Sequence, residues 1–170
     1  MVNKNELLME NLKVFFNKKY NKDILINTLN NNYEISLRII DWFVTNYCKK
    51  NNIGWVVDNT QFIVYINYKL QLKGYSKKYF DPFCRRDRIF FHYGEEKKNL
   101  ITTVGQLNFF KWMIENNIID YIKKNYIEIE SDMHNTIKNT HKKKNKRREL
   151  SKSAIKTLNR KESTIILKFE

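Results

Sequence analysis

The stretch YSKKYFDPFCRRDRIFF, residues 75–91, decides how the chain is organised, because it contains the only proline of the sequence. Proline disfavours the helical conformation in the residue before it, so we expect a turn at Asp81 and Pro82. Before this turn, the sequence predicts a helix that ends near Lys78. After it, residues 88–93 are rich in β-branched and aromatic side chains and predict a strand. The proline therefore separates a helical segment from a strand.

Cations and aromatic rings interleave in the same stretch. The cations are Lys77, Lys78, Arg85, Arg86 and Arg88, and the rings belong to Tyr75, Tyr79, Phe80, Phe83, Phe90 and Phe91. Cations attract phosphates and flat rings stack on bases, so this composition is typical of a nucleic-acid surface. The alternative is that the rings form core and the cations form its solvated rim. The residues alone leave both interpretations open.

The part of the chain before this stretch predicts mainly helices. Apolar residues recur at steps of three and four, and Ser36 has the side chain of a helix N-cap. Two runs are instead rich in β-branched and aromatic residues, which favours strands. The expected elements are, in order, a helix over 5–17, a helical turn or two over 23–29, a helix over about 36–50, strands over 55–57 and 62–66, and a helix to about 78.

After residue 88 we expect a hairpin and then helices. Residues 88–103 predict the hairpin, and Thr103 can cap the helix that follows. The apolar stripe of that helix is Leu107, Phe110, Ile114, Ile118 and Ile122. The pair at 116–117 is expected to break it, with Lys111 and Trp112 on its outer side. Residues 126–133 alternate apolar and acidic side chains and either continue as helix or form a short strand.

These elements predict an α+β protein with N-terminal helices, a small antiparallel sheet from about 55 to 103, and a helical C-terminal half with a basic arm. With 170 residues, of which 42% are hydrophobic, one globular domain can form, and we place it at 1–137. Residues 138–170 are expected to form the basic arm, with a short helix over 150–158 and a terminal strand over 165–169.

The charge balance favours a polyanion as partner. The chain holds 32 Lys and Arg against 18 Asp and Glu, a net charge of +14. Most of the excess lies in the last fifth of the chain, which includes the run KKKNKRR at 142–148. Codon bias is a competing source of lysine, because the single alanine and the many Asn, Lys and Ile indicate an AT-rich genome.

The predicted phosphate contacts form an arm and a folded patch. Clustered Lys and Arg neutralise phosphates and release counterions, which gives binding that depends little on sequence. The contacts are Lys142, Lys143, Lys144, Lys146, Arg147 and Arg148 in the arm, Arg85, Arg86 and Arg88 in the patch, and Lys73 and Lys77 beside it. We expect DNA as partner rather than RNA. The alternatives for the run at 142–148 are a nuclear localisation signal and a solubilising loop.

Other chemistry finds little support. All four glycines stand alone, so no phosphate-binding glycine loop exists, and we expect no cofactor. Cys84 and His92 are too few for a zinc site, and we expect both cysteines to be free thiols. No apolar run reaches the roughly 20 residues that span a bilayer, and the first residues do not have the order of a signal peptide.

Two functions from other classes stay open beside non-enzymatic nucleic-acid binding. One is a metal-dependent nuclease in which Glu128, Glu130 and Asp132, with His134, hold Mg²⁺. The other is a structural or interaction protein whose basic arm binds an acidic partner or a membrane-facing surface.

Three segments resemble a family of small uncharacterised proteins encoded by nucleo-cytoplasmic large DNA viruses. They are SLRIIDWFVTNY at 36–47, YSKKYFDPFCRRDRIFF at 75–91 and TTVGQLNFFKWMIENNIIDYI at 102–122. The resemblance covers about 36–133 and implies no catalytic residue. It implies a protein of the virus factory in the host cytoplasm or of the virion, with the nucleus as the alternative. Taken with the basic charge, this context leads us to expect a role in DNA packaging or transcription, with other virion proteins as further partners.

Overall fold

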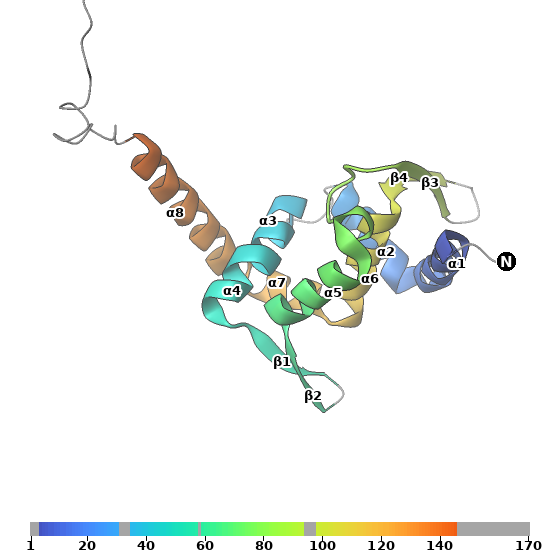
Figure 1. Ribbon diagram of the computed structural model, residues 1–170, viewed down its shortest axis with the longest axis horizontal. Coiled ribbons are helices and arrows are strands. Elements are labelled where there is room, and N and C mark those ends of the chain that lie inside the picture. Colours follow the sequence, from blue (N-terminus) through green and yellow to red (C-terminus); the bar gives the residue numbers. More distant parts are fainter. Residues whose placement is uncertain (1–3, 31–34, 58, 94–97, 146–170) are drawn as a thin grey trace, which may run out of the picture. The chain divides into compact units, whose positions relative to one another are not determined.

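The computed structural model describes residues 4–30, 35–57, 59–93 and 98–145 (Figure 1). The chain divides into two compact units, Met1–Asn135 and Thr136–Glu170. Of the second unit, the described residues are 136–145, which belong to helix α8 (Tyr126–Asn145). The predicted short helix at 150–158, the terminal strand at 165–169 and the arm residues Lys146, Arg147 and Arg148 lie outside the described residues.

The N-terminal part is helical, as predicted. Helix α1 (Lys4–Asn17) confirms the expected helix at 5–17, and α2 (Lys19–Leu29) begins earlier than the turn or two expected from residue 23. Leu12 and Phe16 of α1 are buried, as are Ile24 and Leu25 of α2. Each helix therefore places one apolar stripe in the core.

The predicted helix from 36 to 50 forms in three consecutive parts. These are α3 (Leu37–Trp42), the π-helical segment η1 (Phe43–Tyr47) and α4 (Cys48–Asn51). Ser36 caps it as expected, since its hydroxyl accepts a hydrogen bond from the Ile39 N–H at 3.3 Å. Both cysteines are free thiols, as expected. Burial raises the pKa of the Cys48 thiol, so Cys48 acts as a small packing residue.

The α+β class is confirmed, but the predicted single sheet is wrong. Two separate antiparallel hairpins form, β1 (Gly54–Val57) with β2 (Thr60–Ile63), and β3 (Arg88–Tyr93) with β4 (Lys98–Thr103). Helix α5 (Val64–Tyr79) lies between them in the sequence. It starts inside the run 62–66 that predicted a strand. Val64 is fully buried, and such tertiary packing overrides a β propensity.

Helix α5 contains a break that the sequence did not predict. Ser76 has φ 61° and ψ 167°, a conformation that is costly for any residue with a side chain. Lys69 and Lys73 precede this break and Lys77 follows it. Four-residue spacing keeps residues on one face only in a continuous helix, so Lys77 does not continue the face that Lys69 and Lys73 share.

The remaining helices are α6 (Val104–Glu115), α7 (Ile118–Lys124) and α8. Thr103 caps α6 as expected, accepting a hydrogen bond from the Gln106 N–H at 3.0 Å. The break at 116–117 is confirmed, with Asn117 in the left-handed region at φ 56°. Residues 126–133 are helical, which decides between the two alternatives left open for them.

Helix α6 is buried on nearly all sides, so the prediction that Trp112 lies on an outer side is wrong. Trp112 joins a continuous series of aromatic rings, each within 6.5 Å of the next, centroid to centroid. The series runs through Phe80, Trp112, Phe62, Trp55, Tyr121 and Phe43. Phe80 and Phe91 are core residues, whereas Phe90 is exposed.

No helix within the described ranges is long and apolar enough to cross a membrane.

Candidate functional site

The loop between α5 and β3 carries the predicted arginines, and the start of α6 holds it in place. The Asp81 N–H donates a hydrogen bond to the Gly105 carbonyl at 3.2 Å. A Cβ at Gly105 would lie 2.9 Å from the Lys78 carbonyl oxygen, closer than side chains approach backbone. Glycine is therefore required here by the close approach of two backbone segments.

Buried polar side chains complete this attachment. The Gln106 Nε2 donates to the Pro82 carbonyl at 2.8 Å, and the Asn108 Nδ2 donates to the Tyr79 carbonyl at 3.0 Å. The Thr102 hydroxyl donates to the Gln106 Oε1 at 2.8 Å and orients that amide. Buried polar groups that are fully hydrogen-bonded specify one arrangement, so the loop is held rigidly where the arginines begin.

Arg85 is paired with a carboxylate of its own loop. Its Nε and Nη2 donate to the two oxygens of Asp81 at 3.0 and 2.5 Å. The Asp81 side chain is only 9% exposed, whereas that of Arg85 is 67% exposed. This bidentate pair compensates the charge of Arg85. It weakens the prediction that Arg85 holds phosphate, because an incoming phosphate would compete with Asp81.

A cleft of about 410 Å³ opens beside this pair, and the more buried of its charged residues are the carboxylates Asp41 and Asp81. Burial raises the pKa of Asp41, and the nearby Asp81 raises it further, whereas the Arg85 charge opposes the shift. Burial also raises the pKa of Tyr68 to about 12, with smaller contributions from Asp41 and Asp81. Only the cations at the rim of this cleft are therefore available to bind an external polyanion.

Two of the predicted cations meet at this rim. Lys77 from α5 and Arg86 from the loop both line the cleft, and both are exposed. Arg88 begins β3 and Lys73 lies on α5 before the break at Ser76. Within the described ranges, none of these four cations forms an ion pair, whereas the neighbouring Lys78 pairs with Asp87 at 3.3 Å.

The arm is only partly described. Helix α8 includes Lys142, Lys143 and Lys144, so this part of the predicted arm is helical. Their role in binding stays a prediction.

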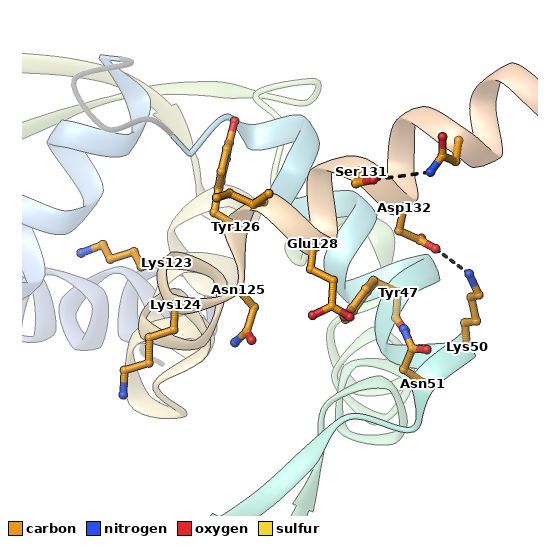
Figure 2. A pocket seen from close by; sticks show the side chains of 12 residues that line it. Tyr47, Lys50, Asn51, Lys123, Lys124, Asn125, Tyr126, Glu128, Ser131 and Asp132 are labelled. Atoms are coloured by element: carbon orange, nitrogen blue, oxygen red, sulfur yellow. Dashed lines mark hydrogen bonds and ion pairs between the residues drawn. The ribbon is translucent and has the colours of Figure 1, made fainter.

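A second cleft, of about 680 Å³, joins η1 and α4 to the first turns of α8 (Figure 2). The Tyr47 hydroxyl donates a hydrogen bond to the Glu128 Oε1 at 2.7 Å. Lys50 pairs with Asp132 at 2.5 Å, and the Trp42 Nε1 donates to the other Asp132 oxygen at 3.1 Å. These contacts fasten α8 to the helical segment that begins at Ser36.

In the second cleft, sequence reasoning combined Glu128 and Asp132 in the nuclease hypothesis, but it did not add Tyr47 or Lys50 to them. The π-helical side of the cleft supplies Tyr47, which is buried, and π-helical turns occur frequently at functional sites. Burial raises the pKa of Tyr47, and the hydrogen bond to Glu128 raises it further. Figure 2 shows Lys124 on the opposite rim, extending away from Glu128. The sequence signal was the four-residue spacing of Glu128 and Asp132, which places both on one face of a helix.

The three carboxylates proposed for a nuclease do not converge. Glu128 and Asp132 share the cleft, whereas Glu130 accepts a hydrogen bond from Tyr126 at 2.9 Å. Residues two apart lie on opposite faces of a helix. The described part of the chain contains no group of three or more His, Cys, Asp or Glu side chains arranged to hold a metal ion. Within the described part of the chain, these three carboxylates therefore do not form the shared Mg²⁺ site that the nuclease hypothesis assigned to them.

Comparison with known proteins places the chain in a family. Over 128 residues it is 43% identical to "Uncharacterized protein L507" of Acanthamoeba polyphaga mimivirus, a match that covers 71% of this chain and 49% of that protein. The chain thus spans about half the length of this relative. No solved structure matches.

The giant-virus context of the predicted resemblance is therefore confirmed, but its limits at 36–133 were too narrow. Residues 1–169 match a family model described as a family of unknown function, DUF7197. The match includes the first 35 residues and nearly all of the predicted basic arm. The chain belongs to the family of unknown function DUF7197.

Proposed function

We propose that this chain is a non-enzymatic nucleic-acid-binding protein that contacts phosphates through Lys77, Arg86 and Arg88. The observation that carries the proposal is the contrast within one loop. Asp81 compensates Arg85, whereas Lys77 and Arg86 line the same cleft from two elements and are engaged by no described carboxylate. Uncompensated cations that line one cleft are what a phosphate backbone binds.

The outer face of β3 adds a stacking surface. Arg88 and Phe90 are two residues apart on the strand, so their side chains lie on the same face. Phe90 is 68% exposed. The aromatic ring can stack on a base, while the neighbouring cation binds a phosphate of the same strand. This strand face therefore supports contact with single-stranded or distorted nucleic acid.

The net charge of the whole chain supports the same function. A charge of +14 attracts polyanions over a distance and speeds their encounter. Lys142, Lys143 and Lys144, with Lys146, Arg147 and Arg148, would add contacts that depend little on sequence. DNA is the proposed partner, and the proposed roles are packaging or transcription for a large DNA virus, in the virus factory or the virion.

Fluorescence polarisation with labelled DNA at several salt concentrations tests the proposal. The double variant Lys77→Gln with Arg86→Gln should bind more weakly and lower the slope of log K against log salt by roughly 1 to 2. The matched control is Lys18→Gln with Lys19→Gln, which removes the same charge from exposed positions at the start of α2. The control should keep the slope of the wild type within about 0.5.

Two results would count against this site. Equal losses in the double variant and in the control would mean that only net charge matters. Loss of binding only after Lys142, Lys143, Lys144, Lys146, Arg147 and Arg148 are all replaced by Ser would assign binding to the arm. Absence of any shift with DNA at physiological salt would leave the structural or interaction protein as the better interpretation.

A further inference from the structure

Strand β3 has an edge that no other strand among the described residues covers. It pairs with β4 alone, from Arg88 opposite Thr103 to Tyr93 opposite Lys98. In an antiparallel pair only alternate residues direct their N–H and C=O groups at the partner strand. Among the described residues, no backbone hydrogen bond outside this ladder involves β3. Half of its backbone groups are therefore available to another extended chain.

This edge forms one wall of a groove whose other wall is helical. Ile89, Phe90, Phe91 and His92 line it consecutively from β3, and α1 and α2 line it from the other side. The groove measures about 720 Å³, within the range of roughly 300–1,000 Å³ that is typical of ligand clefts. Figure 1 shows the β3–β4 hairpin near α1. Four consecutive residues along a wall mean that the groove follows the strand edge.

The floor of the groove is apolar. Met9, Val14 and Phe16 of α1 line it, and Phe16 contacts Phe91 edge to face at 6.0 Å. Val14 is 72% exposed, an unusual exposure for a β-branched apolar side chain beside an open strand edge. Sheet edges are normally protected by charged side chains or proline, and the central residues of this one carry neither. The backbone N–H and C=O groups of this edge are thus unprotected and can pair with another strand.

The charges of the groove select the occupant. Lys13 and Lys22 line it, and no carboxylate does. An acidic segment is therefore attracted, whereas a second copy of this chain, with a net charge of +14, is repelled.

We propose that the groove between α1 and β3 binds an extended segment of a partner protein, in which apolar side chains alternate with carboxylates, as an added strand on β3. Backbone hydrogen bonds to the open edge would supply affinity, and alternate side chains would supply specificity. The apolar side chains would cover Met9 and Val14, and the carboxylates would meet Lys13 and Lys22. Such a site uses neither Lys77 nor Arg86, although Phe90 borders both it and the proposed stacking surface, so the Lys77→Gln with Arg86→Gln variant and Val14→Glu test the two proposals separately.

The probe is a short fluorescein-labelled peptide in which valine and glutamate alternate, titrated with the full chain. The same peptide with N-methyl groups on alternate backbone nitrogens is its matched control, because it keeps the side chains but cannot complete the ladder. The unmodified peptide should bind saturably, and the methylated peptide should bind at least about tenfold more weakly.

Two variants with the same substitution locate the site. Val14→Glu places a carboxylate in the groove and should weaken binding about tenfold or more. Val56→Glu is the control, since Val56 is 70% exposed on β1 of the other hairpin and should leave binding unchanged. Circular dichroism checks that both variants are folded. If Val14→Glu does not fold, Met9→Ser, at another residue of the groove, replaces it with the same expected loss.

Several outcomes would overturn the proposal. These are no peptide binding up to millimolar concentration, equal binding of the methylated peptide, and equal effects of Val14→Glu and Val56→Glu. A dimer in solution that only Val14→Glu dissociates would identify a second copy as the occupant. Displacement of the peptide by DNA, with DNA binding itself lost in Val14→Glu, would assign the groove to nucleic acid.

Discussion

Two clefts of this molecule contain the same kinds of side chain and satisfy them differently. Each contains a buried or half-buried tyrosine and two carboxylates, one of which pairs with an exposed cation. The first holds Tyr68, Asp41, Asp81 and Arg85, and the second holds Tyr47, Glu128, Asp132 and Lys50. The cations are nearly equally exposed, at 67% for Arg85 and 65% for Lys50, and each shortest contact is 2.5 Å. By exposure and distance alone the two ion pairs look equivalent.

Their hydrogen-bond donors differ. Asp132 accepts from both Lys50 and Trp42, and Glu128 accepts from Tyr47. Asp81 receives both of its side-chain donors from Arg85, and no described residue donates to the Asp41 carboxylate. The side-chain hydrogen bonds to the carboxylates of the first cleft therefore come from the Arg85 guanidinium alone. Those of the second cleft come from several different side chains. A buried acceptor is costly only when its last donor is lost.

The largest expected effect is the loss of that guanidinium. Arg85→Ala leaves Asp81 buried without a side-chain donor and should lower the free energy of unfolding by about 2 kcal/mol. Lys50→Ala should cost less than about 1 kcal/mol, because the Trp42 indole still donates to Asp132. Urea denaturation of both variants measures the difference. Equal losses would show that the two pairs are equivalent after all.

A smaller effect is expected at the tyrosine of the second cleft. Tyr47→Phe removes the hydrogen bond to Glu128 and should cost about 1 kcal/mol. Tyr68→Phe is the matched control in the first cleft, since no described residue forms a hydrogen bond with its hydroxyl, and at neutral pH it should change stability by less than about 0.5 kcal/mol. A double-mutant cycle of Tyr47→Phe with Glu128→Gln checks that the loss belongs to this pair. Additive losses would contradict a direct interaction.

The smallest effect appears only in alkali. The pKa of Tyr68 is raised from 10.0 to about 12 in the folded chain, so the folded state holds this proton more tightly than the unfolded state. The resulting stability is present below pH 10 and is lost as the pH rises towards about 12. Thermal melts across this range should show a shallower decline for Tyr68→Phe than for the wild type. Parallel declines would mean that the Tyr68 proton does not contribute.

Much of the local structure was predictable because it depends on neighbours in sequence. The caps at Ser36 and Thr103 are local, since each side chain accepts from a backbone N–H three residues later. The same holds for the break at 116–117 and for strand β3, which begins and ends where the sequence predicted.

The clefts were not predictable, because they join distant segments. Trp42 and Lys50 meet Asp132 across 90 and 82 positions of sequence. The burial of Trp112 and the early start of α5 at Val64 likewise depend on what packs against them. The position of the arginine loop depends on Gln106, whose amide reaches Pro82 from 24 positions away.

The sequence by itself determined the α+β class, the excess of positive charge and the boundaries of most helices and strands, because periodicity, capping and composition act over a few residues. Only the tertiary structure decided which cations are compensated. A carboxylate neutralises a cation through distance and burial, and neither is set by spacing along the chain. Arg85 and Arg86 are adjacent in the sequence, yet one is bound to Asp81 and the other is exposed at the rim of the cleft.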